Sequence, residues 1–174
     1  MLIVFSGLPG TGKTAIAREL ARRIGAVYLR IDSIEQAIRD SALAPVAVED
    51  AGYRAACAAA EDNLKLGRTV VSDSVNPLGT TRDAWRAVAE RAGADIVDVE
   101  VICSDAREHQ RRVESRTPDV AGLRLPTWLE VTMRDYETWG RERVVVDTAM
   151  ATVDECVAAL RRRVNSRSDV PRDR

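Results

Sequence analysis

The sequence predicts an α/β fold in which a parallel sheet carries helices on both faces. Short apolar segments, typical of buried strands, alternate with longer segments of helical periodicity, as in right-handed βαβ units. The first apolar segment leads into a glycine-rich loop and then a helix. The chain has 174 residues, which suits one domain with a sizeable core, and we find no repeat and no second domain.

The first part of the chain is expected to form a strand, a loop, a helix and a second strand. Residues 2–6, LIVFS, form a continuous apolar run, which is typical of a strand buried on both faces. A helix is expected over 13–24, where apolar residues recur on one face, and Gly25 ends it. A second strand is expected over 27–31.

Two helices are expected after the second strand. Asp32 closes that strand, and either Asp32 or Ser33 can cap a helix over 33–41. Pro45 is expected to interrupt the helical pattern, and an alanine-rich helix is expected over 48–66, before a glycine.

The rest of the chain continues the alternation. Strands are expected over 69–73, 95–102 and 143–147. Helices are expected over 81–92, 105–116, 127–138 and 152–164. Residues 117–126 contain two prolines and a glycine without periodicity, which predicts a mobile loop. The polar tail 166–174 is expected to be disordered, leaving one domain over residues 1–165.

Composition limits the compartment and the partners that we expect. The net charge of −1 gives no global basic field that would attract nucleic acid or an anionic membrane. We expect neither a membrane span nor a secretory signal. Cys57, Cys103 and Cys156 match no metal-ligand spacing, so we expect reduced thiols and a cytoplasmic location. The single histidine, His109, lies in an arginine-rich helical stretch and is expected at the surface.

The clearest functional motif is the glycine-rich loop, residues 7–14, GLPGTGKT. This G-x-x-x-x-G-K-T pattern turns backbone N–H groups toward a polyphosphate, and the N-terminus of the following helix favours anions. Lys13 is expected to reach the β- and γ-phosphates of a nucleotide, and the Thr14 hydroxyl to ligate Mg²⁺. The expected nucleotide-binding residues of the loop are Gly7, Leu8, Pro9, Gly10, Thr11, Gly12, Lys13, Thr14 and Ala15.

Residues elsewhere narrow the class of nucleotide-binding protein. Lys13 and Lys65 are the only lysines among 26 basic residues, so the guanine-reading Asn-Lys-x-Asp segment of a GTPase is absent. Asp119 to Gly122 match a GTPase Asp-x-x-Gly motif, but no expected strand precedes them. A large ring ATPase needs a longer chain. These exclusions favour a small kinase.

Two carboxylates end predicted strands. The carboxyl ends of parallel strands converge on the ligand crevice, so Asp32 is expected to orient or deprotonate an attacking hydroxyl. A helix cap is the alternative role for Asp32. Asp73 is expected to join the Mg²⁺ shell through water or to hold Thr14, and turn initiation is its alternative role.

An arginine cluster precedes the expected loop. Arg112 and Arg116 are four residues apart and share a helix face, with Arg107 and Arg111 nearby. Guanidinium groups stabilise the charge of a transferring phosphoryl group, and a loop over 117–126 can close as a lid that excludes water. The alternative is a solvated basic face.

These motifs together resemble the small P-loop kinases, a family that includes bacteriophage polynucleotide kinase, chloramphenicol phosphotransferase, gluconate kinase and many AAA family ATPase-like kinases. The resemblance spans roughly residues 1–165 and rests on the glycine loop, Asp32, the segment VVSDSVNP and the Arg112–Arg116 pair. It implies a three-layer P-loop fold with a five-stranded parallel sheet of adenylate-kinase-like type and an arginine-bearing lid.

The resemblance also implies roles for single residues. Asp32 is the implied base, Lys13 and Thr14 hold ATP and Mg²⁺, and Arg116 is the lid arginine. The loop around Asp147 is implied to lie on the adenine side.

The sequence therefore predicts a kinase that transfers the γ-phosphoryl group of Mg-ATP to a hydroxyl of a small molecule. A 5′-hydroxyl polynucleotide or nucleoside kinase and a non-enzymatic ATP-binding regulator are the alternatives. Glu35 weighs against a polynucleotide, because the phage kinase has a phosphate-binding arginine there, although Arg39 lies one turn further.

Several points stay open at this stage: the acceptor, the pathway, the oligomeric state and the choice between ATP and GTP. Trp128 and Trp139 are expected on nearly the same helix face, where core packing is favoured over acceptor stacking. Contact with substrate is undecided for Arg39, Tyr53, Arg54, Arg82 and Trp128.

Overall fold

The computed structural model describes residues 1–42, 48 and 50–168. Five strands form one parallel sheet in the order β2-β3-β1-β4-β5, which confirms the predicted α/β fold. The strands are β1 Leu2–Ser6, β2 Val27–Arg30, β3 Val70–Asp73, β4 Ile96–Ile102 and β5 Val144–Asp147.

Helices connect the strands at positions close to those expected. They are α1 Lys13–Ile24, α2 Ile31–Arg39, α3 Ala51–Lys65, α4 Gly79–Arg91, α5 Ala106–Ser115, α6 Trp128–Thr132 and α7 Val153–Ser168. None of the helices in the described ranges combines the length and apolar character needed to cross a membrane. The three cysteines, all within those ranges, are free thiols.

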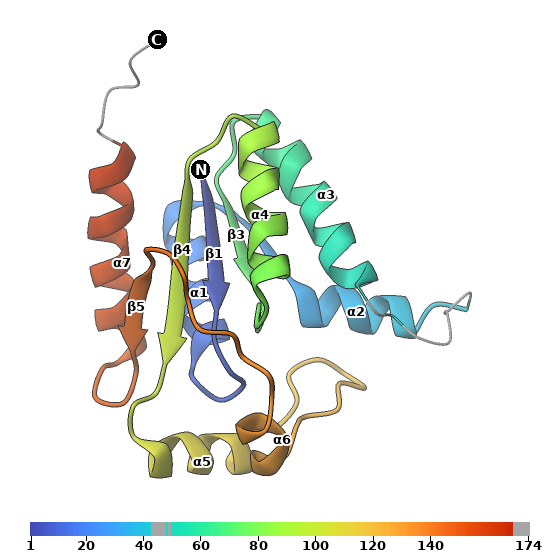
Figure 1. Ribbon diagram of the computed structural model, residues 1–174, viewed down its shortest axis with the longest axis vertical. Coiled ribbons are helices and arrows are strands. Elements are labelled where there is room, and N and C mark those ends of the chain that lie inside the picture. Colours follow the sequence, from blue (N-terminus) through green and yellow to red (C-terminus); the bar gives the residue numbers. More distant parts are fainter. Residues whose placement is uncertain (43–47, 49, 169–174) are drawn as a thin grey trace.

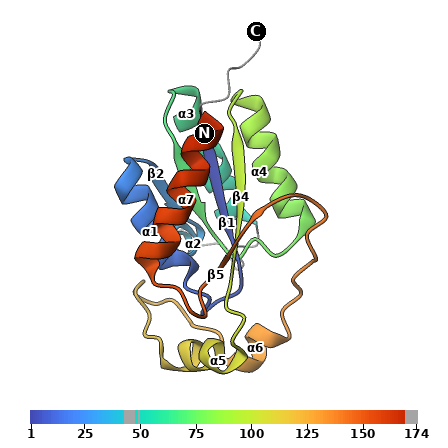
Figure 2. The same ribbon diagram turned by 90° about the vertical axis from the view of Figure 1, so that its left-hand side faces the viewer.

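The sheet lies between two helical layers (Figures 1 and 2). Helices α1 and α7 cover one face, and α3 and α4 cover the other. The central strand β1 is buried along its whole length: Ile3 and Phe5 pack toward α1 and α7, whereas Leu2 and Val4 pack toward α3 and α4. Burying each such side chain contributes about 1.5–3 kcal/mol, so β1 holds both layers together.

Strand register brings the functional side chains to one edge of the sheet. Asp73 pairs with Phe5 on one side and with Arg30 on the other. All five strands run parallel and therefore end at the same edge of the sheet, and α5 and α6 lie below this carboxyl edge in Figure 1. The loop after β1 therefore lies beside the ends of β2 and β3 and faces the segment between α5 and α6.

The expected helix over 127–138 is wrong beyond its first turn. Thr127 and Glu130 form a capping box at the start of α6, but the helix ends at Thr132. A helix would direct the Glu137 N–H to the Met133 carbonyl oxygen, but this N–H donates to the Pro77 carbonyl oxygen at 2.9 Å instead. The buried Arg82 guanidinium holds the two segments together, because it donates to the carbonyl oxygens of Pro77 and Glu137, both at 2.9 Å. Tertiary contacts thus override helical periodicity here.

The two tryptophans of this segment consequently do not share a helix face. Trp139 lies under the Arg82 guanidinium, 4.1 Å from its carbon to the ring centre, a cation–π contact. The Trp128 ring meets His109 edge-on, with ring centres 5.1 Å apart. Arg82 therefore supports the turn after β3, where it donates to the carbonyl oxygens of Asn76 and Pro77.

Expectations at two further places need correction or fall outside the described residues. Helix α7 continues to Ser168, so the start of the tail expected to be disordered is helical, an extension of a helix whose Val157, Leu160 and Val164 are buried. The end of the tail, 169–174, and the predicted break at Pro45 lie outside the described residues.

Candidate active site

The glycine loop joins β1 to α1 in a conformation that needs glycine. A Cβ atom on Gly10 would lie 2.4 Å from Val113 Cγ2, so α5 packs directly over the loop. Gly12 has φ +87° and precedes α1 without any side-chain cap. The first-turn N–H groups of α1 are therefore left for an anion at the helix N-terminus.

His109 supports this loop and is not a surface residue, contrary to expectation. Its side chain is buried, and Nε2 lies 2.8 Å from the Pro9 carbonyl oxygen, which can only accept a hydrogen bond. His109 and Val113 are four residues apart on α5 and are both buried. That spacing was the available sequence signal for a helix face packed against the loop.

Lys13 and Asp73 form a buried ion pair at the base of the site, with Lys13 Nζ 3.1 Å from Asp73 Oδ1. The Tyr28 hydroxyl donates to Asp73 Oδ2 at 2.7 Å. Burial alone raises the pKa of Asp73, but the Lys13 charge and hydrogen bonds from Tyr28, Thr14 and Lys13 outweigh it and hold the pKa below its usual value. Asp73 is thus an ionised carboxylate beside Thr14.

This ionised carboxylate should give stability a pH dependence that Asp73→Asn removes. Because the native pKa is lowered, the contribution is fully present above the unfolded-state pKa, near 3.8, and is lost as pH falls through the lower native value. Urea unfolding should give a constant difference between wild type and variant from about pH 7 to 5, shrinking below about pH 4. A difference unchanged at about pH 3 would contradict it.

Asp32 lies in the first turn of α2, not at the helix cap. Helix α2 begins at Ile31, and its cap position is Arg30, so neither Asp32 nor Ser33 caps it. The strand ends at Arg30, one residue earlier than expected, and the chain enters α2 at the next residue. The Asp32 side chain is 39% exposed and lines the cavity.

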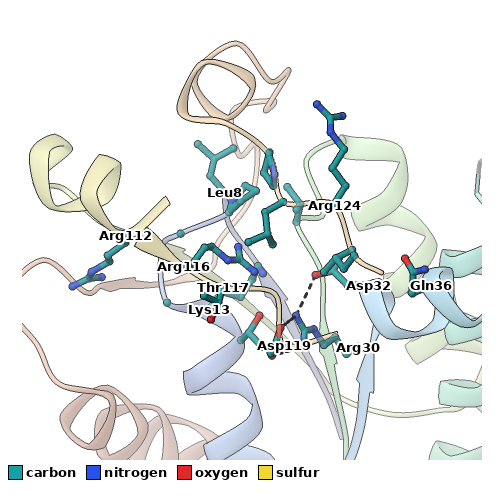
Figure 3. A pocket seen from close by; sticks show the side chains of 18 of the residues that line it. Leu8, Lys13, Arg30, Asp32, Gln36, Arg112, Arg116, Thr117, Asp119 and Arg124 are labelled. Atoms are coloured by element: carbon teal, nitrogen blue, oxygen red, sulfur yellow. Dashed lines mark hydrogen bonds and ion pairs between the residues drawn. The ribbon is translucent and has the colours of Figure 1, made fainter. Parts of the chain in front are cut away.

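Arg30 is a site residue that the sequence did not reveal (Figure 3). Its guanidinium is buried and donates to both oxygens of Asp119, at 2.7 and 2.9 Å. Its Nη2 also lies 3.6 Å from Asp32 Oδ2. The hydrogen bond from Arg30 is the main cause that lowers the pKa of the Asp119 carboxyl. The aspartate of the Asp-x-x-Gly segment therefore pairs with Arg30, a contact unrelated to GTPase chemistry.

The two arginines predicted as catalytic point in different directions. Arg112 donates to the Thr148 hydroxyl and carbonyl oxygens, at 2.8 and 3.0 Å, and points away from Asp32 in Figure 3. Arg116 ends α5 and points into the cavity, with no hydrogen bond or ion pair to the described residues. The structure thus leaves Arg116 available to a ligand and engages Arg112 with the phosphate-loop side.

Asp147 ends β5 and holds the loop that follows. Its Oδ1 accepts hydrogen bonds from the backbone N–H groups of Ser104 and Ala149, each at 3.0 Å. Asp147 therefore shapes the loops beyond β4 and β5, and its place on the adenine side stays a prediction.

A cavity of about 1050 Å³ joins the phosphate loop to α2 and to the loop between α5 and α6. Seven arginines and Lys13 line it, against four carboxylates, those of Asp32, Glu35, Asp119 and Glu130. No aromatic side chain of the described residues lines it. The cavity is thus basic and suits a polar, anionic ligand.

Only one of the five undecided residues lines this cavity, namely Arg39, which pairs with Glu35 at 3.2 Å. The Tyr53 hydroxyl accepts the N–H of Asn76 instead. Gly52 packs against Glu35, so α3 supports α2 from behind. Arg54, Arg82 and Trp128 also lie outside the cavity lining.

These features define a P-loop nucleotide-binding protein. A family described as an AAA domain matches residues 2–122, and the chain belongs to that family. A search of curated proteins gave no match.

Solved structures share the fold. Mycobacterium tuberculosis APS kinase CysC in complex with AMPPNP and APS aligns with a TM-score of 0.69 at 18% identity, covering 94% of this chain and 96% of that one. A gluconokinase from Sinorhizobium meliloti 1021 gives 0.63 at 24%, covering 95% and 94%. Chaetomium thermophilum Kti12 in complex with ADP-AlF3 gives 0.64 at 21%, covering 93% and 98%. The predicted fold of small P-loop kinases is thereby confirmed.

Proposed function

We propose that this protein is an ATP- and Mg²⁺-dependent kinase that phosphorylates a hydroxyl of a small molecule. The observation that carries the proposal is the single cavity that Lys13, Asp32 and Arg116 line together. Lys13 belongs to the nucleotide side of this cavity, Asp32 to the opposite side, and Arg116 to the end of the helix before the lid loop. The kinase names of two structures with this fold support the same class.

The residues at the phosphate loop fit a nucleotide with a metal ion. Asp73 is buried, ionised and hydrogen-bonded by Thr14, so carboxylate and hydroxyl oxygens, the ligands that Mg²⁺ favours, lie together. The acidic, cysteine and histidine side chains of the described residues form no cluster of three that could hold a metal alone. We therefore expect a site shared with nucleotide phosphates, where Mg²⁺ would neutralise phosphate charge.

In the proposed reaction the acceptor oxygen attacks the γ-phosphorus and the bond from that phosphorus to the β–γ bridging oxygen breaks. Asp32 orients the acceptor hydroxyl and takes its proton, and ADP leaves with the bond electrons. Lys13 and Arg116 stabilise negative charge on the phosphoryl oxygens. For Lys13 this requires turning from Asp73 toward the phosphates.

The cavity favours a small acceptor over a polynucleotide. Single-stranded nucleic acid is commonly held by aromatic stacking, and the described lining offers no aromatic ring. A coupled assay for ADP release from Mg-ATP, run over a panel of hydroxylated metabolites preselected by thermal shift with AMPPNP, tests the proposal. We expect at least one compound to stimulate ADP release strongly.

Two other outcomes would contradict this proposal. Nucleotide binding without stimulation by any compound would favour the regulator. Single-strand binding that weakens steeply with salt, together with stimulation by 5′-hydroxyl oligonucleotides, would favour the polynucleotide kinase.

A further inference from the structure

Arg30 is held rigidly at the place where an acceptor would meet the candidate base. It is the last residue of β2 and pairs across the sheet with Asp73. Only 9% of it is exposed, and its Nη2 lies 3.6 Å from Asp32 Oδ2. A buried guanidinium keeps its charge and therefore needs anionic or polar partners.

The partner that Arg30 has in this structure comes from a different kind of segment. Asp119 belongs to the lid loop, which we define as residues 117–126 between α5 and α6 and which contains no helix or strand. Its side chain is 44% exposed, and its carboxylate faces the two Arg30 nitrogens with one oxygen each. The ion pair thus joins a fixed cation to an anion that only a loop supports.

The geometry of this pair is that of a bound oxyanion. Two parallel N–H···O bonds from one guanidinium match a carboxylate or a phosphate, and such charge-assisted pairs are strong and directional. Asp119 places this oxyanion next to Asp32 inside the cavity (Figure 3). The position that an acceptor must reach is therefore occupied by a carboxylate of the chain itself.

The rest of the Arg30 environment can accept a further anion. The Nε atom of Arg30 is buried without a hydrogen-bond partner among the described residues. The side chains of Arg116 and Arg134 line the same cavity and form no hydrogen bond or ion pair with the described residues, although Arg116 acts electrostatically on Asp119 and Arg134 on Glu35. An acidic ligand would thus meet guanidinium N–H groups that lack hydrogen-bond partners, whereas a neutral polyol would bring no charge to balance them.

From this arrangement we propose that Arg30 binds an oxyanion of the acceptor and that Asp119 is its internal competitor. The acceptor is then a compound that carries a carboxylate or phosphate group besides its reacting hydroxyl. Its oxyanion replaces the Asp119 carboxylate on Arg30 and releases the lid loop from β2. This inference rests on the proposed kinase function, because it assigns the acceptor side of the same cavity.

Binding of three matched compounds tests this proposal without requiring turnover. Glycerol, glycerate and glycerol 3-phosphate share a hydroxylated three-carbon chain and differ in their anionic group. Affinities are measured by calorimetry with the phosphate loop saturated by Mg-AMPPNP. Asp119→Asn and Asp119→Ala should each bind one or both anions at least tenfold more tightly than wild type, with glycerol unchanged. The anion that gains identifies carboxylate or phosphate as the preferred group.

Variants of Arg30 and of a remote aspartate complete the design. Combining Asp119→Asn with Arg30→Gln, or with Arg30→Lys, which keeps the charge but not the fork, should cancel the gain. Asp62→Asn, an exposed change on α3, should match wild type. The proposal is overturned if Asp119 variants that bind AMPPNP normally gain no anion affinity. It is also overturned if they instead gain affinity for AMPPNP over ADP, which would assign Arg30 to the γ-phosphate.

These outcomes separate the inference from the kinase proposal. A protein that binds the anions as expected but never releases ADP would sustain the Arg30 assignment while refuting phosphoryl transfer. A protein that phosphorylates a neutral compound, with no anion effect in the Asp119 variants, would sustain the kinase proposal and refute the Arg30 assignment.

Discussion

Replacing Asp32 by asparagine is expected to lower the rate of phosphoryl transfer by about 10²–10⁴-fold while ATP affinity stays within about twofold of wild type. Asparagine keeps the size of the side chain but cannot take a proton from the acceptor hydroxyl. Asp32 lies in the first turn of α2, across the cavity from the phosphate loop, and its carboxylate accepts no helix-capping hydrogen bond. The loss should therefore fall on chemistry and not on nucleotide binding.

Single-turnover kinetics and nucleotide titration separate these two quantities. Asp40→Asn, at the C-cap of the same helix, is the matched control, because Asp40 lies outside the cavity lining and its carboxylate accepts a hydrogen bond from the Gln36 side-chain amide at 2.8 Å. Parallel losses of transfer rate, ATP affinity and folding stability in Asp32→Asn would instead indicate a structural role.

Lys13→Ala is expected to have the second large effect, on binding and chemistry together. The variant removes the only cationic side chain of the glycine loop and should lower turnover by about 10³-fold or more, with markedly weaker ATP binding. It also leaves the buried Asp73 carboxylate with Tyr28 and Thr14 alone, so the free energy of unfolding should fall as well.

The chain offers a natural control for this change. Lys65 is the only other lysine and lies at the exposed end of α3, where it pairs with Glu61 at 2.7 Å. Lys65→Ala should leave ATP binding and turnover unaltered. Intact ATP binding in folded Lys13→Ala would mean that the loop does not hold the nucleotide phosphates.

Most of the fold could be predicted because its signals are local. Buried strands such as Leu2–Ser6 are continuous apolar runs, and the α1 boundaries coincide with the glycines at positions 12 and 25. The failure at 127–138 has a non-local cause. The Glu137 N–H, which would continue the helix that begins with α6, donates to the Pro77 carbonyl oxygen instead. Arg82, more than fifty positions earlier in the sequence, donates to the Glu137 carbonyl oxygen, and no helical pattern encodes these contacts.

In the candidate site, too, the residues with local sequence signals could be predicted and those that depend on non-local contacts could not. Lys13, Asp32 and Asp73 follow from strand ends and the glycine motif, since parallel strands converge at one edge. The role of Arg30 could not be predicted in this way, because it depends on contact with Asp119, and only the path of the lid loop brings the two residues together. An arginine at a strand end carries no local signal of burial.

Transfer of a labelled γ-phosphoryl group tests the kinase proposal most directly. ATP labelled in its terminal phosphate is incubated with Mg²⁺, the protein and the acceptor compounds, and the products are separated. We expect label in an organic phosphate ester, formed in equal amount to ADP and absent with Lys13→Ala. Label found only in inorganic phosphate, or retained in ATP whatever acceptor is added, would contradict the assignment of this cavity to phosphoryl transfer.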